Sequence, residues 1–216
     1  MDVLVDNASL ILDGFWKTLQ LTVVSGAYAL VIGVLVAIAR VSPVGILRGF
    51  GTVYVTLFRN TPLLILIIIA YYGMPDIGIN PGFFPLITIA MGIYTSTFIA
   101  EALRSGINGV PVGQAEAARA IGMPFGMTMT QVVLPQAGRL IVPPVASVLI
   151  ALVKNTSLAG AFGIAEATFR MRGLLNDHAT DRWWIFFGIG LGYVVIVEVI
   201  SLVAYLIERR WKVVSR

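Results

Sequence analysis

The chain has 216 residues, of which 58% are apolar and only 12% are charged, whereas soluble domains average about 45–50% apolar and about 25% charged residues. Together with a mean hydropathy of +0.91, this composition excludes an ordinary soluble enzyme and predicts an all-α integral membrane protein. The net charge is +4, and its placement along the chain decides whether it points to nucleic acid or to membrane topology.

About five stretches are apolar and long enough to cross a bilayer, which takes roughly 20 residues each. We predict spans at residues 19–39, 53–74, 83–100, 140–163 and 183–207. No repeat, low-complexity tract or Pro- or Ser-rich linker divides the chain. Residues 1–216 are therefore expected to form a single transmembrane domain, with the first span retained.

Basic and acidic residues separate between the two sides of these spans. The basic side would hold Arg40, Arg48, Arg59, Arg104, Arg119, Arg139, Arg209, Arg210, Lys212 and Arg216, and the other side Asp2, Asp6, Asp13 and Asp76. By the positive-inside rule, the N-terminus is outside and the C-terminus is cytoplasmic. Topology accounts for the positive charge, so nucleic-acid binding is not predicted.

A polar loop at residues 104–136 separates the third and fourth spans on the cytoplasmic side. Within it, Pro111 can open a short helix, and Gly122 is placed to end that helix with a left-handed residue. Pro124 is expected to open a second short helix, which Pro135 should terminate. An ordinary amphipathic surface helix would have the same local features.

The spacing of residues in this loop resembles a known signature. Glu116-Ala-Ala-Arg-Ala-Ile-Gly122 is followed after nine residues by Val132-Val-Leu-Pro135. This resembles the cytoplasmic motif of permease subunits of ATP-driven (ABC) importers, with Val132 in place of Ile. The resemblance implies the type I importer permease fold and a cytoplasmic coupling helix that contacts an ATPase. The coupling residues it implies are Glu116, Ala117, Ala118 and Gly122.

Ala118 and Gly122 lie four residues apart on one helix face. We therefore expect the backbone of a partner to approach closely there.

Three other segments narrow the resemblance to the polar amino-acid uptake branch of these importers. They are Arg59-Asn-Thr-Pro-Leu63, residues 94–106 and Leu152-Val-Lys-Asn-Thr-Ser-Leu158. Residues 93–108 and 113–119 look most like permeases of actinobacterial glutamate importers. The resemblance thus implies uptake of glutamate or a related polar amino acid across a bacterial cell membrane.

The same resemblance implies a set of partners. They are a second permease chain, identical or related, a cytosolic ABC ATPase dimer, an extracytoplasmic substrate-binding protein and membrane lipid. The sequence has no G-x-x-x-x-G-K-[ST] loop for nucleotide phosphates. We therefore expect no catalytic residue and no cofactor in this chain, with ATP and Mg²⁺ bound by the ATPase.

The fourth span contains an unusual polar patch. Pro143 and Pro144 should bend or break its helix, and four polar residues follow in an otherwise apolar run: Lys154, Asn155, Thr156 and Ser157. In one interpretation they line a substrate path, with Lys154 available for a carboxylate. In the other, Lys154 reaches to the interface and the remaining groups bond local backbone.

Two sets of residues near helix ends, each with at least one charged side chain, have structural interpretations. Arg59, Asn60 and Pro62 favour a membrane anchor and a helix start over substrate contact. Glu101 and Arg104 are three residues apart and are expected to pair on one face.

Two other function classes fit the sequence less well. A secondary transporter or channel subunit without an ATPase is the alternative, but the chain is short and has few intramembrane ionisable residues. An intramembrane hydrolase would need a buried nucleophile and base, and the single histidine, His178, lies outside the predicted spans. With one histidine and no cysteine, no metal site is predicted.

Overall fold

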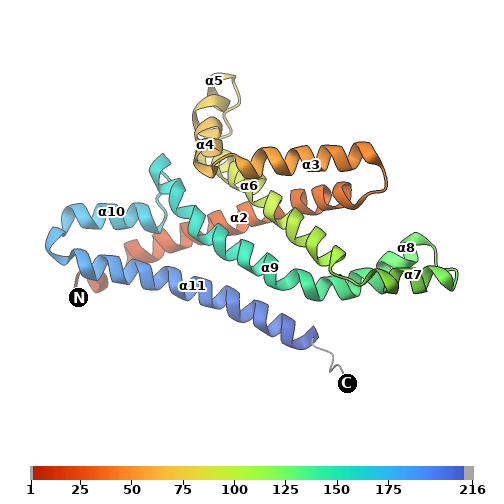
Figure 1. Ribbon diagram of the computed structural model, residues 1–216. Coiled ribbons are helices and arrows are strands. Elements are labelled where there is room, and N and C mark those ends of the chain that lie inside the picture. Colours follow the sequence, from red (N-terminus) through yellow and green to blue (C-terminus); the bar gives the residue numbers. More distant parts are fainter. Residues whose placement is uncertain (1, 212–216) are drawn as a thin grey trace.

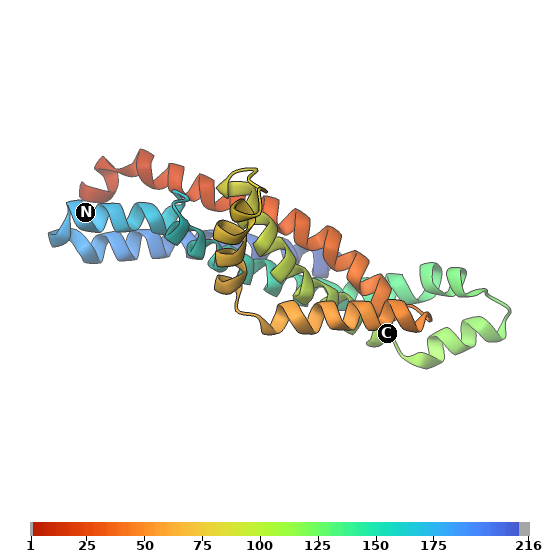
Figure 2. The same ribbon diagram turned by 90° about the horizontal axis from the view of Figure 1, so that it is seen from above.

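The computed structural model describes residues 2–211 of the chain. Every regular element in that part is a helix, which confirms the predicted all-α class. Figures 1 and 2 show an elongated bundle in which most long helices run along one axis. Two of the predicted basic residues, Lys212 and Arg216, lie outside the described residues.

Within residues 2–211, four helical runs are long and apolar enough to cross a membrane, and a bent helix pair supplies a fifth. The single helices among them are α2 (Ala8–Val41), α6 (Phe83–Asn108) and α11 (Arg182–Trp211), the last preceded by the short 3-10 turn η4 (Ala179–Asp181). The fourth run consists of α8 (Phe125–Met127), the π-helical turn η2 (Thr128–Val133), α9 (Leu134–Asn155) and the 3-10 turn η3 (Thr156–Phe162).

The bent pair consists of α3 (Gly45–Asn60) followed by α4 (Leu63–Ile68), the π-helical turn η1 (Ile69–Gly73) and α5 (Met74–Asp76). Three helices are short: α1 (Asp2–Asp6), α7 (Val112–Ala120) and α10 (Ala167–Asp177). The number of spanning segments agrees with the prediction of about five.

The second predicted span, residues 53–74, is not one continuous helix but falls on the bent pair. Residues 53–60 belong to α3, which meets the following helix at 96°. Thr61 and Pro62 are extended at the corner, with ψ of 127° and 134°. Proline lacks a donor N–H and disfavours helical backbone in the residue before it, so the chain turns here and α4 starts afresh. The predicted helix start at Pro62 is confirmed.

Other helices extend beyond the predicted spans because their polar residues find partners. Helix α2 begins at Ala8 rather than at residue 19, and its Asp13 carboxylate accepts a hydrogen bond from the Arg170 guanidinium at 2.7 Å. Helix α6 continues past residue 100 because Glu101 is paired on its own helix with Arg104. Charges that would end a span in an isolated helix are thus accommodated by the bundle.

The fourth helical run contradicts the predicted helix end at Pro135 and the predicted break at Pro143 and Pro144. It passes through Pro135, which lies in the first turn of α9 directly after the wider turn η2, where a missing N–H disrupts least. Pro143 and Pro144 also lie inside α9 without ending it, as neighbouring groups in membrane helices allow. The regular helix ends instead at Asn155, where η3 begins.

The core of the bundle is the contact between α2 and α6. Both helices present buried small residues at every fourth position: Ser25, Ala29, Gly33 and Ala37 on α2, and Gly92, Ser96 and Ala100 on α6. Rows of small residues at this spacing let two helix backbones approach closely inside a membrane. A Cβ built on Gly92 would lie 2.5 Å from the Tyr28 Cβ and 3.3 Å from the Ser25 carbonyl oxygen. The backbone of α2 therefore leaves no room for a side chain at position 92.

A buried carboxylate holds the start of α10. Glu166 is 0% exposed and caps the helix by accepting hydrogen bonds from the N–H groups of Thr168, at 2.9 Å, and Phe169, at 2.7 Å. The Tyr193 hydroxyl of α11 donates to the same carboxylate at 2.9 Å, while the Ala167 N–H donates to the Thr18 hydroxyl of α2 at 3.3 Å. Burial raises the pKa of the Glu166 carboxyl. This cluster joins α10 to both neighbouring helices.

The two ends of the bundle carry different elements. In Figure 1 the N-terminus and the turn between α10 and α11 lie at one end, while α7 and α8 lie at the other. The N-terminus and the Glu116 loop are thus at opposite ends, as the predicted topology requires. Which end faces the cytoplasm stays a prediction.

We expect Gly92→Ala to destabilise the bundle by about 1–3 kcal/mol, the usual effect of adding volume to a tightly packed site. The measurement is the thermal unfolding midpoint of the purified protein. The matched control is Gly190→Ala in α11, where an added Cβ would meet no atom within 4 Å. If both variants lower the unfolding midpoint equally, the close α2–α6 contact is not what excludes a side chain at position 92.

We expect Glu166→Ala to lower stability by about 2–4 kcal/mol, since it removes a helix cap and leaves the half-buried Tyr193 hydroxyl with only the Thr168 hydroxyl as a partner. Glu166→Gln should lower stability less than Glu166→Ala, because the glutamine amide resembles the protonated carboxyl that burial favours. Asp177→Ala, an exposed carboxylate in the last turn of the same helix, is the control for thermal unfolding. Equal midpoints for all three variants would contradict the anchoring role.

Candidate functional site

Helix α7 stands apart from the rest of the bundle. Figures 1 and 2 show it at one extremity of the molecule, beside α8. It begins at Val112 directly after Pro111, and its end has the geometry that the sequence predicts. Gly122 has a φ of +85°, its N–H donates to the Arg119 carbonyl at 3.0 Å, and the Met123 N–H donates to the Ala118 carbonyl at 3.1 Å. These two bonds form a Schellman cap, which confirms the predicted left-handed residue.

One face of α7 packs against its own chain. Ala115 lies against a small core cluster of Val110, Val133 and Ala137, and Ala118 is only 5% exposed. The expectation that Ala118 and Gly122 together present an open face to a partner is therefore wrong for Ala118. Its small side chain serves the packing of α7 within this chain.

The other face of α7 is open. Glu116, Ala117 and Gly122 are exposed, and three large apolar side chains beside them are strongly exposed: Val112 at 71%, Ile121 at 79% and Phe125 at 67%. Val112 and Ile121 lie outside the helical runs suited to spanning a membrane. Exposed apolar side chains grouped in this way are typical of a protein interface, so this face of α7 is a candidate docking surface.

An ion-pair network stabilises the bundle on the approach to α7. The Glu101 carboxylate of α6 accepts hydrogen bonds from Arg104, at 2.9 and 3.1 Å, which confirms the predicted pair. Its other oxygen pairs with Arg40 near the end of α2. This second partner is 61 residues away in the chain, and helical spacing alone could not identify it. The network ties α2 to α6 two turns before α6 ends.

The polar patch at the end of α9 divides into two kinds of residue. The Thr156 hydroxyl donates to the Val153 carbonyl at 2.6 Å, and the Ser157 hydroxyl donates to the Lys154 carbonyl at 2.7 Å. Both hydroxyls are thus used by local backbone. Lys154 is exposed and Asn155 is half-buried, and no side-chain hydrogen bond joins either of them to another described residue.

The segment after this patch is packed firmly. Phe162, at the end of η3, belongs to the core cluster that contains Ile67 and Met91, and its ring lies 5.2 Å from that of Tyr71. The Tyr71 ring in turn stacks on Phe83 at 4.3 Å. The cluster connects η3 to α4, η1 and α6, so the position of Lys154 is coupled to the bent second span.

Two other cations lie against aromatic rings. The Arg59 guanidinium is 5.0 Å from the centre of the Phe98 ring, which favours the structural interpretation of this residue. The Lys17 ammonium is 5.5 Å from the centre of the Phe84 ring and lines a groove of about 380 Å³ on α2. The predicted first span begins at residue 19 and leaves Lys17 outside it. Since α2 begins at Ala8, Lys17 and Lys154 are the two lysines within the described spanning helices.

The chain matches known transport proteins over most of its length. Residues 29–213 match the model of the family described as binding-protein-dependent transport system inner membrane component. A glutamate transport system permease protein of Corynebacterium glutamicum is 37% identical over 198 residues, which cover 86% of this chain and 87% of that protein. A probable glutamine ABC transporter permease protein of Bacillus subtilis is 35% identical over 210 residues, 97% of either chain.

Solved structures agree with these relatives. A crystal structure of an amino acid ABC transporter with histidines superposes with a TM-score of 0.88 at 28% identity and covers 96% of each chain. A methionine ABC transporter in an inward-facing conformation shares the fold, with a TM-score of 0.77 over 96% of this chain and 99% of that chain, at 23% identity. The chain therefore belongs to the inner-membrane components of binding-protein-dependent transport systems and has the type I ABC importer permease fold.

Proposed function

We propose that this chain forms the translocation path of an ATP-driven importer for glutamate or a closely related polar amino acid. The relatives described above include permeases named for glutamate and glutamine, and a glutamate/aspartate import permease protein of Escherichia coli is 34% identical over 210 residues. The observation that carries the proposal is α7. It is a capped helix at one extremity that exposes apolar side chains beside Glu116 and Ala117.

The proposed partners follow from this surface and from the family. A cytosolic ATPase dimer, which supplies the sites for ATP and Mg²⁺, would dock on α7 of two permease chains, and an extracytoplasmic binding protein would deliver the substrate. Glu116, Ala117 and Gly122 would form the ATPase contact, and Ala118 would fix α7 to the bundle.

The geometry supports a direct route from the ATPase contact to the membrane interior. Helix α7 packs against η2, and the helical run continues from α8 through α9 to η3 as one body. A displacement of α7 would therefore move η2 and, along α9, the segment that carries Lys154. Such rigid elements, rather than loops, are what carry force between distant sites.

Lys154 is the proposed contact for the substrate carboxylate. An acidic amino acid brings carboxylates into a poorly solvated path, where an unpaired charge is costly and an ammonium group is a favourable partner. Lys154 is exposed at the end of α9, and its side chain makes no hydrogen bond to another described residue. Asn155 would contribute hydrogen bonds beside it. Thr156 and Ser157, whose hydroxyls bond local backbone, would shape the helix end.

We expect the wild-type chain to co-purify with an ATPase and Ala117→Trp to weaken that association roughly five- to 150-fold, as about 1–3 kcal/mol of overpacking implies. Ala117 suits this test better than Gly122, because the φ of +85° at Gly122 would strain any larger residue whether or not a partner is present.

The matched control for this association is Ala8→Trp, another exposed helical alanine in the first turn of α2, at the opposite end of the bundle. The association is measured by quantitative mass spectrometry of the purified complex. Full retention of the ATPase by Ala117→Trp would contradict the docking role of α7. Active uptake without any ATPase would favour a secondary transporter.

We expect Lys154→Met to reduce glutamate uptake at low substrate concentration roughly ten- to a hundredfold, because hydrogen bonds to charged groups contribute about 1.5–3 kcal/mol. Asn155→Ala should have a smaller effect, of about 0.5–1.5 kcal/mol. Uptake is normalised to the amount of inserted protein, and unlabelled glutamine, aspartate and arginine serve as competitors to identify the cargo.

Lys17→Met is the comparison for Lys154→Met, since it removes the other lysine of the described spans without changing length. If Lys154→Met transports normally and Lys17→Met does not, the substrate carboxylate is bound in the Lys17 groove instead. Loss of inserted protein in Lys154→Met would instead indicate a structural role.

A further inference from the structure

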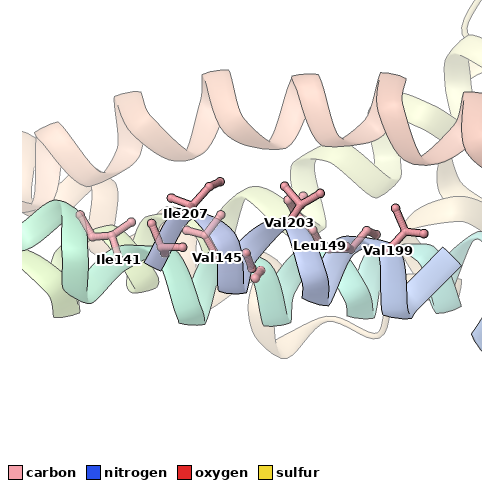
Figure 3. A pocket seen from close by; sticks show the side chains of 10 residues that line it. Ile141, Val145, Leu149, Val199, Val203 and Ile207 are labelled. Carbon is pink, nitrogen blue, oxygen red and sulfur yellow. The ribbon is translucent and has the colours of Figure 1, made fainter. Parts of the chain in front are cut away.

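An apolar groove runs between α9 and α11. Its volume is about 360 Å³, and Figure 3 shows its labelled walls: Ile141, Val145 and Leu149 from α9 face Val199, Val203 and Ile207 from α11. Each row repeats every fourth residue, so the two rows form parallel ridges along their helices. Ala146 and Ala204 also line the groove, and their short side chains leave the space between the ridges open.

The groove leads to a basic end. A second hollow, of about 550 Å³, adjoins the groove by sharing Val203 and Ile207 and is also lined by Arg209 and Arg210. On α9, Arg139 lies two residues before Ile141 and is exposed. Among the residues whose side chains are described, no ion pair joins any of these three arginines to a carboxylate. The apolar groove is therefore continuous with a hollow whose arginines make no ion pair with a described carboxylate.

The dimensions fit one lipid in one leaflet. Each wall covers nine residues from its first to its last labelled side chain, and the eight steps between them rise roughly 12 Å at about 1.5 Å per residue. Half of a hydrocarbon core of about 30 Å is roughly 15 Å. We propose that the groove between α9 and α11 binds an acyl chain of an anionic phospholipid, whose phosphate is held by Arg209 and Arg210.

Charge favours this ligand over a second copy of the chain. Paired permeases related by a two-fold axis along the membrane normal keep the same ends together, so an interface centred on this groove would bring like arginines toward each other. An anionic headgroup neutralises them instead. Each basic residue close to an anionic lipid surface strengthens binding by a factor of about five.

The test uses the full-length chain purified in its transporter complex, with phosphatidylglycerol and phosphatidylcholine as the two probes. Lipid binding is measured by titration with native mass spectrometry. We expect wild-type protein to prefer phosphatidylglycerol. Replacing both arginines in Arg209→Gln/Arg210→Gln should weaken phosphatidylglycerol about 30-fold and phosphatidylcholine much less, because the choline ammonium already neutralises the phosphate of that lipid. Ala204→Phe, which fills the groove, should weaken both lipids.

The charge-matched control is Arg172→Gln/Arg182→Gln, which removes two exposed arginines around the turn between α10 and α11. This control should bind both lipids as the wild-type chain does. Equal binding of the two lipids by wild-type protein, or an unchanged phosphatidylglycerol titration in Ala204→Phe, would overturn the site. So would efficient disulfide formation between two copies that carry Val203→Cys, because the groove would then be covered by protein.

Discussion

The close contact of α2 with α6 is the constraint on which the rest of the bundle depends. The hydrophobic effect drives helices together in soluble proteins, but lipid provides no such force. Helices associate in membranes mainly through close van der Waals packing. Small residues at every fourth position bring these two backbones together, and a glycine at position 92 allows the Tyr28 side chain to pass. Helices α3 and α9 then pack on this pair, so the placement of both proposed functional segments follows from it.

Polar interactions set the boundaries of this apolar core. The Glu101 network holds α2 and α6 together toward α7, and the Glu166 cluster joins α2, α10 and α11 toward the other end. Both carboxylates are satisfied by several donors, as groups removed from water require. Between them, α2 and α6 are held mainly by close packing, and the Tyr54 hydroxyl of α3 donates to the Ile93 carbonyl of α6 at 3.3 Å and shares a hydrogen bond of 2.8 Å with the Ser96 hydroxyl.

The sequence predicts the elements better than their connections. Apolar length identifies the spans, and the Gly122 cap follows from local backbone preference. The prolines show the limit: Pro62 breaks a span, whereas Pro135, Pro143 and Pro144 lie inside a helix. That outcome depends on how neighbouring turns satisfy the freed backbone, which local pattern does not encode. For the same reason Glu166, a lone acid after an apolar run, gave no signal of its anchoring role.

The helical run from Phe125 to Phe162 contains 38 residues and is therefore about 57 Å long, against a hydrocarbon core of about 30 Å. Even with a tilt of about 20°, more than 20 Å of this rod must lie among headgroups and in water. A thinner or thicker bilayer would then change which residues meet the interface without drawing α7 into lipid. The surplus length thus keeps the proposed docking end clear of the hydrocarbon core in membranes of different thickness.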